Sequence, residues 1–117
     1  MSIVLLEDDP DIAALIIELL AELGHGARHL RDSASVVPDD AVHLAITDLL
    51  SVGAADPEKA RAWVATLRAA YPTAKVVVVT AYGAVLPAGP GGPDALISKP
   101  FAIDDFIHTV SPFLPQA

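Results

Sequence analysis

The sequence predicts an α/β protein built on a doubly wound, five-stranded parallel sheet. Short apolar segments alternate with segments of helical periodicity along the 117 residues. The apolar segments lack the regular polar alternation of strands that are exposed on one face, which is typical of strands covered by helices on both faces. Polar residues follow these segments, at the edge where doubly wound sheets place their sites. We expect one domain over residues 1–117.

The first βα unit is the clearest in the amino-terminal half. Ile3–Leu6 predicts a buried strand, and Ile12–Leu23 predicts a helix, because its large apolar residues recur on one helical face. Asp9 is expected to cap this helix, with Pro10 at its first position. Gly24 is expected to end it.

The second unit is weaker. A strand is expected at Ala27–Leu30 and a short helix around Ser33–Val37, which Pro38 limits to one or two turns. The third strand is expected at His43–Thr47, an apolar run that ends before Asp48.

The third unit begins with Asp56 as a helix cap and Pro57 at the first helical position. Pro72 closes this helix. Its apolar face comprises Ala60, Trp63, Val64, Leu67 and Tyr71, so we expect Trp63 and Tyr71 to belong to the core or its rim.

The β-branched run Lys75–Val79 predicts a central parallel strand that ends at Thr80, and Ala95–Ser98 predicts the fifth strand. Ile103, Phe106, Ile107 and Val110 mark a last helix, which Pro112 ends or kinks. Between these strands, seven of the twelve residues from Gly83 to Asp94 are glycine or proline, so no regular helix is expected there.

Composition and charge exclude several classes of function. The formal net charge of −8 repels nucleic acid and anionic membrane surfaces. The chain has no cysteine, which rules out disulfides and thiolate metal sites and fits a cytoplasmic protein. The uncharged stretch Val76–Pro93 approaches the length of a membrane span, but its four glycines and three prolines argue against a bilayer helix.

Polar residues at the strand ends indicate a phosphoryl-transfer site. Glu7, Asp8 and Asp48 would bring three negative charges to one edge of the sheet, where Mg²⁺ and Lys99 would balance them. A carboxylate, a hard cation, the Thr80 hydroxyl and an ammonium together can transfer a phosphoryl group onto the carboxylate. In the alternative interpretation, Glu7 and Asp8 form a solvated acidic turn and Asp48 caps a turn.

The acidic pair Glu7-Asp8, then Asp48, Thr80-Ala81 and Lys99-Pro100 occur in an order and spacing that resemble the receiver domain of two-component response regulators. The resemblance covers nearly the whole chain and implies a flavodoxin-like receiver fold. It also implies that Asp48 is the phosphoacceptor.

The same resemblance implies roles for the other matching positions. Asp8, with Glu7 partly through water, and the backbone carbonyl of Leu50 would hold Mg²⁺ together with Asp48. The Thr80 hydroxyl and Lys99 would contact the phosphoryl group. Small Ala81 would leave room for it, and the Lys99–Pro100 peptide bond would be cis.

Two positions depart from the usual receiver pattern. Leu96 stands where receivers usually carry an aromatic residue that switches with the threonine, and the breaker-rich segment Gly83–Asp94 replaces the fourth helix. Together with the sequence Thr80-Ala81-Tyr82-Gly83, this segment is similar to a subset of stand-alone alphaproteobacterial receivers. We expect Tyr82 to take over the switching role, phosphorylation to order residues 83–94, and autodephosphorylation to be slow, because Leu50 and Tyr82 flank the path of the attacking water.

The predicted function is that of a single-domain response regulator rather than an enzyme. It would accept a phosphoryl group from a histidine kinase or phosphotransfer protein onto Asp48, and then bind a downstream protein or act as a phosphate sink. Two alternatives are a receiver-like interaction module that is never phosphorylated and an aspartyl phosphatase. The phosphatase is disfavoured because Leu50 stands where such enzymes carry a second aspartate. The histidines at 25, 29, 43 and 108 show no ligand spacing, so surface or packing roles are expected.

Overall fold

A computed structural model describes residues 2–30, 32–49, 56–80 and 92–114 of the chain. Its five strands are β1 (Ser2–Leu6), β2 (Ala27–Leu30), β3 (Val42–Thr47), β4 (Lys75–Thr80) and β5 (Ala95–Ser98). They form one parallel sheet in the order β2-β1-β3-β4-β5. This order is that of a doubly wound sheet, the class predicted from the sequence, and its switch point lies between β1 and β3.

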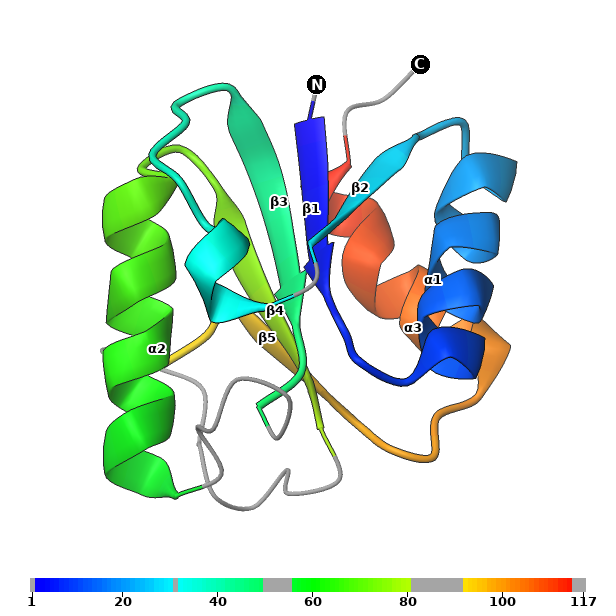
Figure 1. Ribbon diagram of the computed structural model, residues 1–117. Helices are drawn as coiled ribbons and strands as arrows, with labels where there is room; N and C mark the ends of the chain where they lie inside the picture. Colours follow the sequence, from blue (N-terminus) through cyan, green and yellow to red (C-terminus); the bar gives the residue numbers. More distant parts are fainter. Residues whose placement is uncertain (1, 31, 50–55, 81–91, 115–117) are drawn as a thin grey trace.

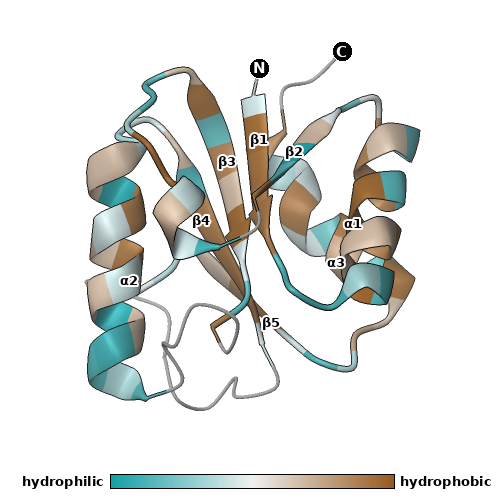
Figure 2. Cartoon of the chain, viewed as in Figure 1, coloured by the Kyte–Doolittle hydropathy of each residue, from teal (hydrophilic) through white to brown (hydrophobic). Residues whose placement is uncertain are grey.

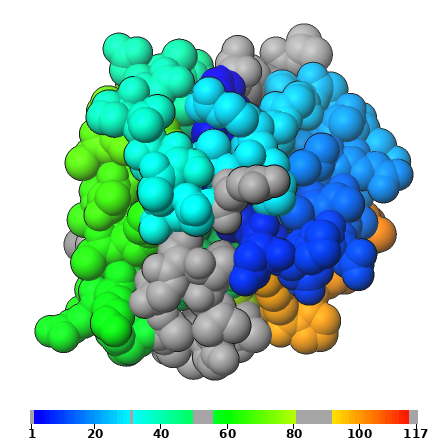
Figure 3. All heavy atoms as spheres, in the orientation of Figure 1, coloured from blue at the N-terminus to red at the C-terminus, as the bar shows by residue number. Residues whose placement is uncertain are grey.

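Helices cover both faces of the sheet. The helices α1 (Pro10–Glu22) and α3 (Ile103–Val110) lie on one face and α2 (Pro57–Ala70) lies on the other (Figure 1). Short 3₁₀ helices occupy Ser33–Ser35 (η1) and Ser111–Phe113 (η4). In Figure 3 the segment that follows β2, in cyan, lies at the surface between α2 in green and α1 in blue.

The helix boundaries follow from local chemistry. Asp9 caps α1, since its Oδ1 accepts hydrogen bonds from the backbone N–H groups of Asp11 (2.9 Å) and Ile12 (3.3 Å). At the other end, Gly24 adopts a φ of +90°, a conformation that favours glycine. Asp56 caps α2 in the same way, accepting from the N–H of Lys59. The expected caps and the glycine stop are therefore confirmed.

The sheet separates two apolar clusters, and the strand residues of both are almost entirely buried. Strand residues alternate between the clusters: Val4, Ala45 and Val78 pack toward α2, whereas Ile3, Ile46 and Val77 pack toward α1 and α3. Figure 2 shows this as apolar colour on the strands and on the helix surfaces that face them. Trp63 and Tyr71 are buried in the α2 cluster, as predicted.

The weak second helix is reduced to the 3₁₀ turn η1, in agreement with the limit set by Pro38. Pro112 lies in η4, directly after α3 ends. Most of the breaker-rich segment from Gly83 to Asp94, and with it the predicted loss of a fourth helix, lies outside the described residues. Among the helices of the described ranges, none combines the length and the apolar character needed to span a membrane.

Candidate phosphoryl-transfer site

The three acidic residues singled out in the sequence lie together where β1 and β3 end. These strands are neighbours in the sheet, and the backbone N–H of Asp48 donates to the carbonyl of Leu6 at 2.9 Å. One carboxylate oxygen from each of Glu7, Asp8 and Asp48 can be chosen so that all three lie within 4.8 Å of one another. Glu7 and Asp48 are buried and Asp8 is exposed, so the cluster opens toward solvent on the Asp8 side.

Lys99, the residue directly after β5, reaches the same cluster. Its backbone N–H donates to the carbonyl of Thr80 at 2.9 Å, which holds the end of β5 against the end of β4. Its ammonium lies 2.6 Å from Glu7 Oε1 and 3.7 Å from Asp48 Oδ1. Lys99 therefore pairs most closely with Glu7 in this structure. The Lys99–Pro100 peptide bond is cis, as the resemblance implied.

The electrostatics of the cluster favour a divalent cation. Burial raises the pKa of Glu7 above its usual value, and the Asp48 carboxylate raises it further, while the hydrogen bond from Lys99 opposes both effects. Among the described residues, the three carboxylates lie close to the Lys99 ammonium, so negative groups outnumber positive ones in this cluster. Carboxylate oxygens that are close together and open to water on one side suit a hard divalent ion, so the residues fit the predicted metal.

The other predicted positions are placed as follows. Thr80 is fully buried at the end of β4, and Leu96 is partly buried and packs against the α2 cluster. Leu50, Ala81 and Tyr82 lie outside the described residues, so the metal-ligand, pocket and switching roles predicted for them remain predictions.

Of the histidines, His29 contacts this region. Its Nε2 donates to the backbone carbonyl of Glu7 at 2.7 Å, which ties β2 to the residue after β1. The imidazole thus bonds to the backbone of Glu7, and the metal-ligand cluster found in the described residues includes no histidine. His29, His43 and His108 are exposed and His25 is half-buried, in agreement with the surface or packing roles expected for the histidines.

Two residues beside the site were not predicted to act there. The Trp63 indole N–H donates to Thr47 Oγ1 at 2.9 Å, and the Thr47 hydroxyl donates to the backbone carbonyl of Asp48 at 2.8 Å. A buried tryptophan usually donates its N–H to a hydrogen-bond partner. The threonine at the end of the apolar third strand could therefore have been identified from the sequence as a candidate partner of Trp63.

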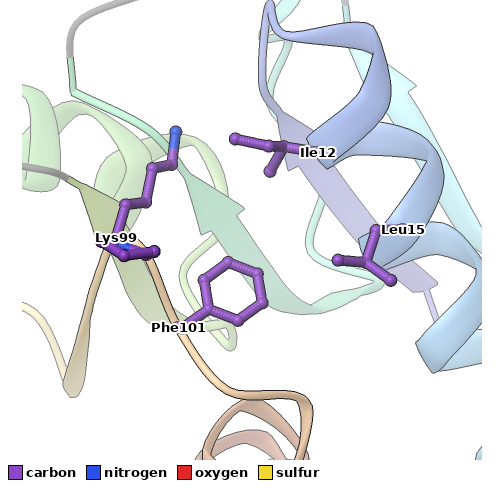
Figure 4. A pocket seen from close by; sticks show the side chains of 5 residues that line it. Ile12, Leu15, Lys99 and Phe101 are labelled. Carbon is purple, nitrogen blue, oxygen red and sulfur yellow. The ribbon is translucent and has the colours of Figure 1, made fainter.

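An apolar pocket of about 390 Å³ lies beside Lys99. Figure 4 shows Ile12 and Leu15 of α1 opposite Phe101, with the Lys99 side chain extending past them. Its lining is apolar apart from Lys99, so it suits an apolar group and is chemically distinct from the carboxylate cluster.

No protein-family model and no curated protein matches this sequence. Solved structures do resemble it. A CheY-like response regulator receiver domain protein from Methanospirillum hungatei has a TM-score of 0.71 and 19% identity, covering 95% of this chain and 90% of that chain. A CheY-like response regulator receiver domain from Methylobacillus flagellatus has a TM-score of 0.69 and 22% identity, covering 97% of this chain and 98% of that chain.

A third neighbour is a response regulator from Burkholderia pseudomallei described with a phosphorylated aspartic acid, a calcium ion and citrate. It has a TM-score of 0.68 and 17% identity. The match covers 91% of this chain but only 64% of that chain, so this chain spans less than two thirds of its length. These similarities establish the fold: the chain has the flavodoxin-like fold of response regulator receiver domains.

Proposed function

From the receiver fold and the acidic cluster we propose that this protein is a response regulator that accepts a phosphoryl group on Asp48. The observation that carries the proposal is the meeting of Glu7, Asp8 and Asp48 within 4.8 Å at the sheet's switch point, with the Lys99 ammonium 3.7 Å from Asp48. Phosphoryl transfer depends mainly on positioning and charge stabilisation, and this arrangement supplies both. Phosphoacceptance is a signalling step, so the protein need not be an enzyme.

In the proposed reaction, a carboxylate oxygen of Asp48 attacks the phosphorus of a phosphohistidine on a histidine kinase or phosphotransfer protein. The new O–P bond forms as the P–N bond breaks, the donor imidazole leaves with the bonding electron pair, and Asp48 becomes an acyl phosphate. The Lys99 ammonium would then exchange its contact with Glu7 for a phosphoryl oxygen, and the Thr80 hydroxyl would donate to another.

Glu7, Asp8 and Asp48 would hold Mg²⁺, with the Leu50 carbonyl as a further predicted ligand. When bound, the ion supplies positive charge beside the phosphoryl oxygens. The calcium ion and phosphorylated aspartic acid described for the Burkholderia pseudomallei regulator support both the cation and the covalent product.

Intact mass spectrometry after incubation with acetyl phosphate and Mg²⁺ tests the proposal. We expect a species heavier by one phosphoryl group in the wild type, and none in Asp48→Asn or in wild type treated with EDTA. Asp40→Asn is the matched control, because Asp40 is an exposed aspartate outside the cluster. A wild type that stays unmodified, also after exposure to a phosphorylated histidine phosphotransfer protein, would favour the interaction module that is never phosphorylated.

A further inference from the structure

A chain of two hydrogen bonds links helix α2 to the backbone of the proposed phosphoacceptor. The Trp63 indole N–H donates to Thr47 Oγ1 at 2.9 Å, and the Thr47 hydroxyl donates to the Asp48 carbonyl at 2.8 Å. Trp63 lies on α2 and Thr47 is the last residue of β3. These two hydrogen bonds therefore join the α2 layer to the end of β3, where the site begins (Figure 1).

The direction of this chain is fixed by chemistry. An indole N–H can only donate and a backbone carbonyl can only accept, so the hydroxyl between them must accept from Trp63 and donate to Asp48. Trp63 is 8% exposed, Thr47 is 0% exposed and Asp48 is 4% exposed. Removing the hydroxyl would therefore leave a buried donor and a buried acceptor each without this bond, in a place where replacement by water is costly.

Asp48 is thereby held on both sides of its backbone. Its N–H donates to the Leu6 carbonyl on β1, and its carbonyl accepts from Thr47 on the α2 side. These two bonds orient the peptide groups before and after Asp48, and with them the Cα–Cβ bond from which its side chain extends.

We propose that Trp63, acting through the Thr47 hydroxyl, is a positioning residue for the Asp48 site. The inference rests on the proposed function. Losing either link lets the peptide after Asp48 rotate, which misplaces the Asp48 carboxylate relative to Glu7 and Asp8. The consequence is weaker Mg²⁺ binding and slower phosphoryl acceptance.

The test measures Mg²⁺ affinity by isothermal titration calorimetry in four variants. Thr47→Val removes the hydroxyl, Thr47→Ser keeps it, and Trp63→Phe removes the indole N–H. Val64→Ala is the control, because Val64 is a buried neighbour on α2 that belongs to the same cluster but makes no side-chain hydrogen bond. We expect Mg²⁺ affinity to fall about tenfold in Thr47→Val and Trp63→Phe, as for other residues that orient metal ligands, and to change by less than about twofold in Thr47→Ser and Val64→Ala.

The double variant Thr47→Val/Trp63→Phe adds a readout that simple destabilisation would not reproduce. Because Trp63 acts through Thr47, the double variant should bind Mg²⁺ about as tightly as Thr47→Val alone rather than showing the product of two effects. Trp63 is the only tryptophan, so its indole N–H gives one NMR resonance, which should shift on Mg²⁺ addition in the wild type and in Thr47→Ser.

The outcomes separate this inference from the proposed function. A wild type that neither binds Mg²⁺ nor forms the Asp48 adduct overturns both. If the wild type binds Mg²⁺ and either Trp63→Phe or Thr47→Val binds it with the same affinity as the wild type, only the positioning role is overturned. An equal loss in Val64→Ala would also overturn it, because the effect would then come from packing. If Thr47→Val does not fold, Trp63→Phe and Thr47→Ser still decide the question.

Discussion

Replacing Lys99 by methionine is expected to destabilise the protein in the absence of divalent cations. The Lys99 ammonium lies 2.6 Å from Glu7 and 3.7 Å from Asp48, whose side chains are only 1% and 5% exposed. Methionine fills similar space without the charge, so two buried carboxylates lose the cation beside them. Removing one partner of a buried ion pair is costly for this reason.

The loss of stability in Lys99→Met is limited by proton uptake at Glu7. At an effective dielectric constant of about 20, the contacts at 2.6 Å and 3.7 Å correspond to about 6 and 4.5 kcal/mol of attraction, offset by the cost of burying the ammonium. Glu7 can instead bind a proton, an uptake that burial already favours by raising its pKa and that becomes easier as pH falls. Removing one partner of a buried ion pair costs about 3 to 5 kcal/mol, so with proton uptake we expect a loss of about 3 kcal/mol at pH 7, which for a chain of this size is about 12 °C in Tm.

The sign of the pH dependence follows from linkage. In Lys99→Met the pKa of Glu7 is raised further in the folded state, so between the two pKa values the folded state binds more protons than the unfolded state. The stability of the variant then falls as pH rises, and the gap in stability between Lys99→Met and wild type should shrink between pH 7 and pH 5.5.

Urea unfolding in EDTA measures this gap. Lys75→Met is the matched control, because Lys75 is exposed at the start of β4 and outside the cluster. Adding Mg²⁺ should narrow the gap between Lys99→Met and wild type, since a divalent cation neutralises the same carboxylates. The reasoning would be refuted if both methionine variants lost the same stability, or if the loss in Lys99→Met did not change with pH.

Three further predictions concern stability. Mg²⁺ should stabilise the wild type by about 2.7 kcal/mol at 100 times its Kd, and Asp48→Asn should show much less of this effect in thermal scans; equal stabilisation would place the ion elsewhere. Burial raises the pKa of Tyr71 above its ordinary value of 10.0, an effect that Arg28 opposes and Asp39 strengthens. As pH rises, the Tyr71 hydroxyl therefore loses its proton in the unfolded state before it does so in the folded state, and stability falls above about pH 10. Tyr71→Phe should show a shallower decline between pH 9 and 11, and identical slopes would contradict this. Gly24→Ala should cost about 1 kcal/mol in urea unfolding, because alanine is strained at a φ of +90°; a neutral effect would argue against that strain.

The strands and helices could be predicted because their signals are local. Asp9 with Pro10 and Asp56 with Pro57 mark helix starts through the chemistry of single residues, and the run from Lys75 to Thr80 has no credible alternative to a buried strand. The meeting of Glu7, Asp8 and Asp48 was also predictable, because parallel strands in a doubly wound sheet bring their carboxyl ends to one edge.

The side-chain partners could not be predicted in the same way. The sequence places Lys99 opposite three carboxylates, but the contact at 2.6 Å to Glu7 rather than to Asp48 depends on the depth of each side chain in the fold. The bond between Trp63 and Thr47 joins residues 16 positions apart on different layers, and helical periodicity identifies only the buried face of α2.

Lys99 directly follows the last strand of the sheet, and this has a consequence for the timing of maturation. The carboxylates come from β1 and β3, which leave the ribosome early, whereas the ammonium enters the cluster only after β5 has been synthesised and has paired with β4. A nascent chain that ends before β5 holds the acidic residues without their lysine. Under the proposed function, the full charge arrangement around Asp48 would therefore form only when the sheet is complete.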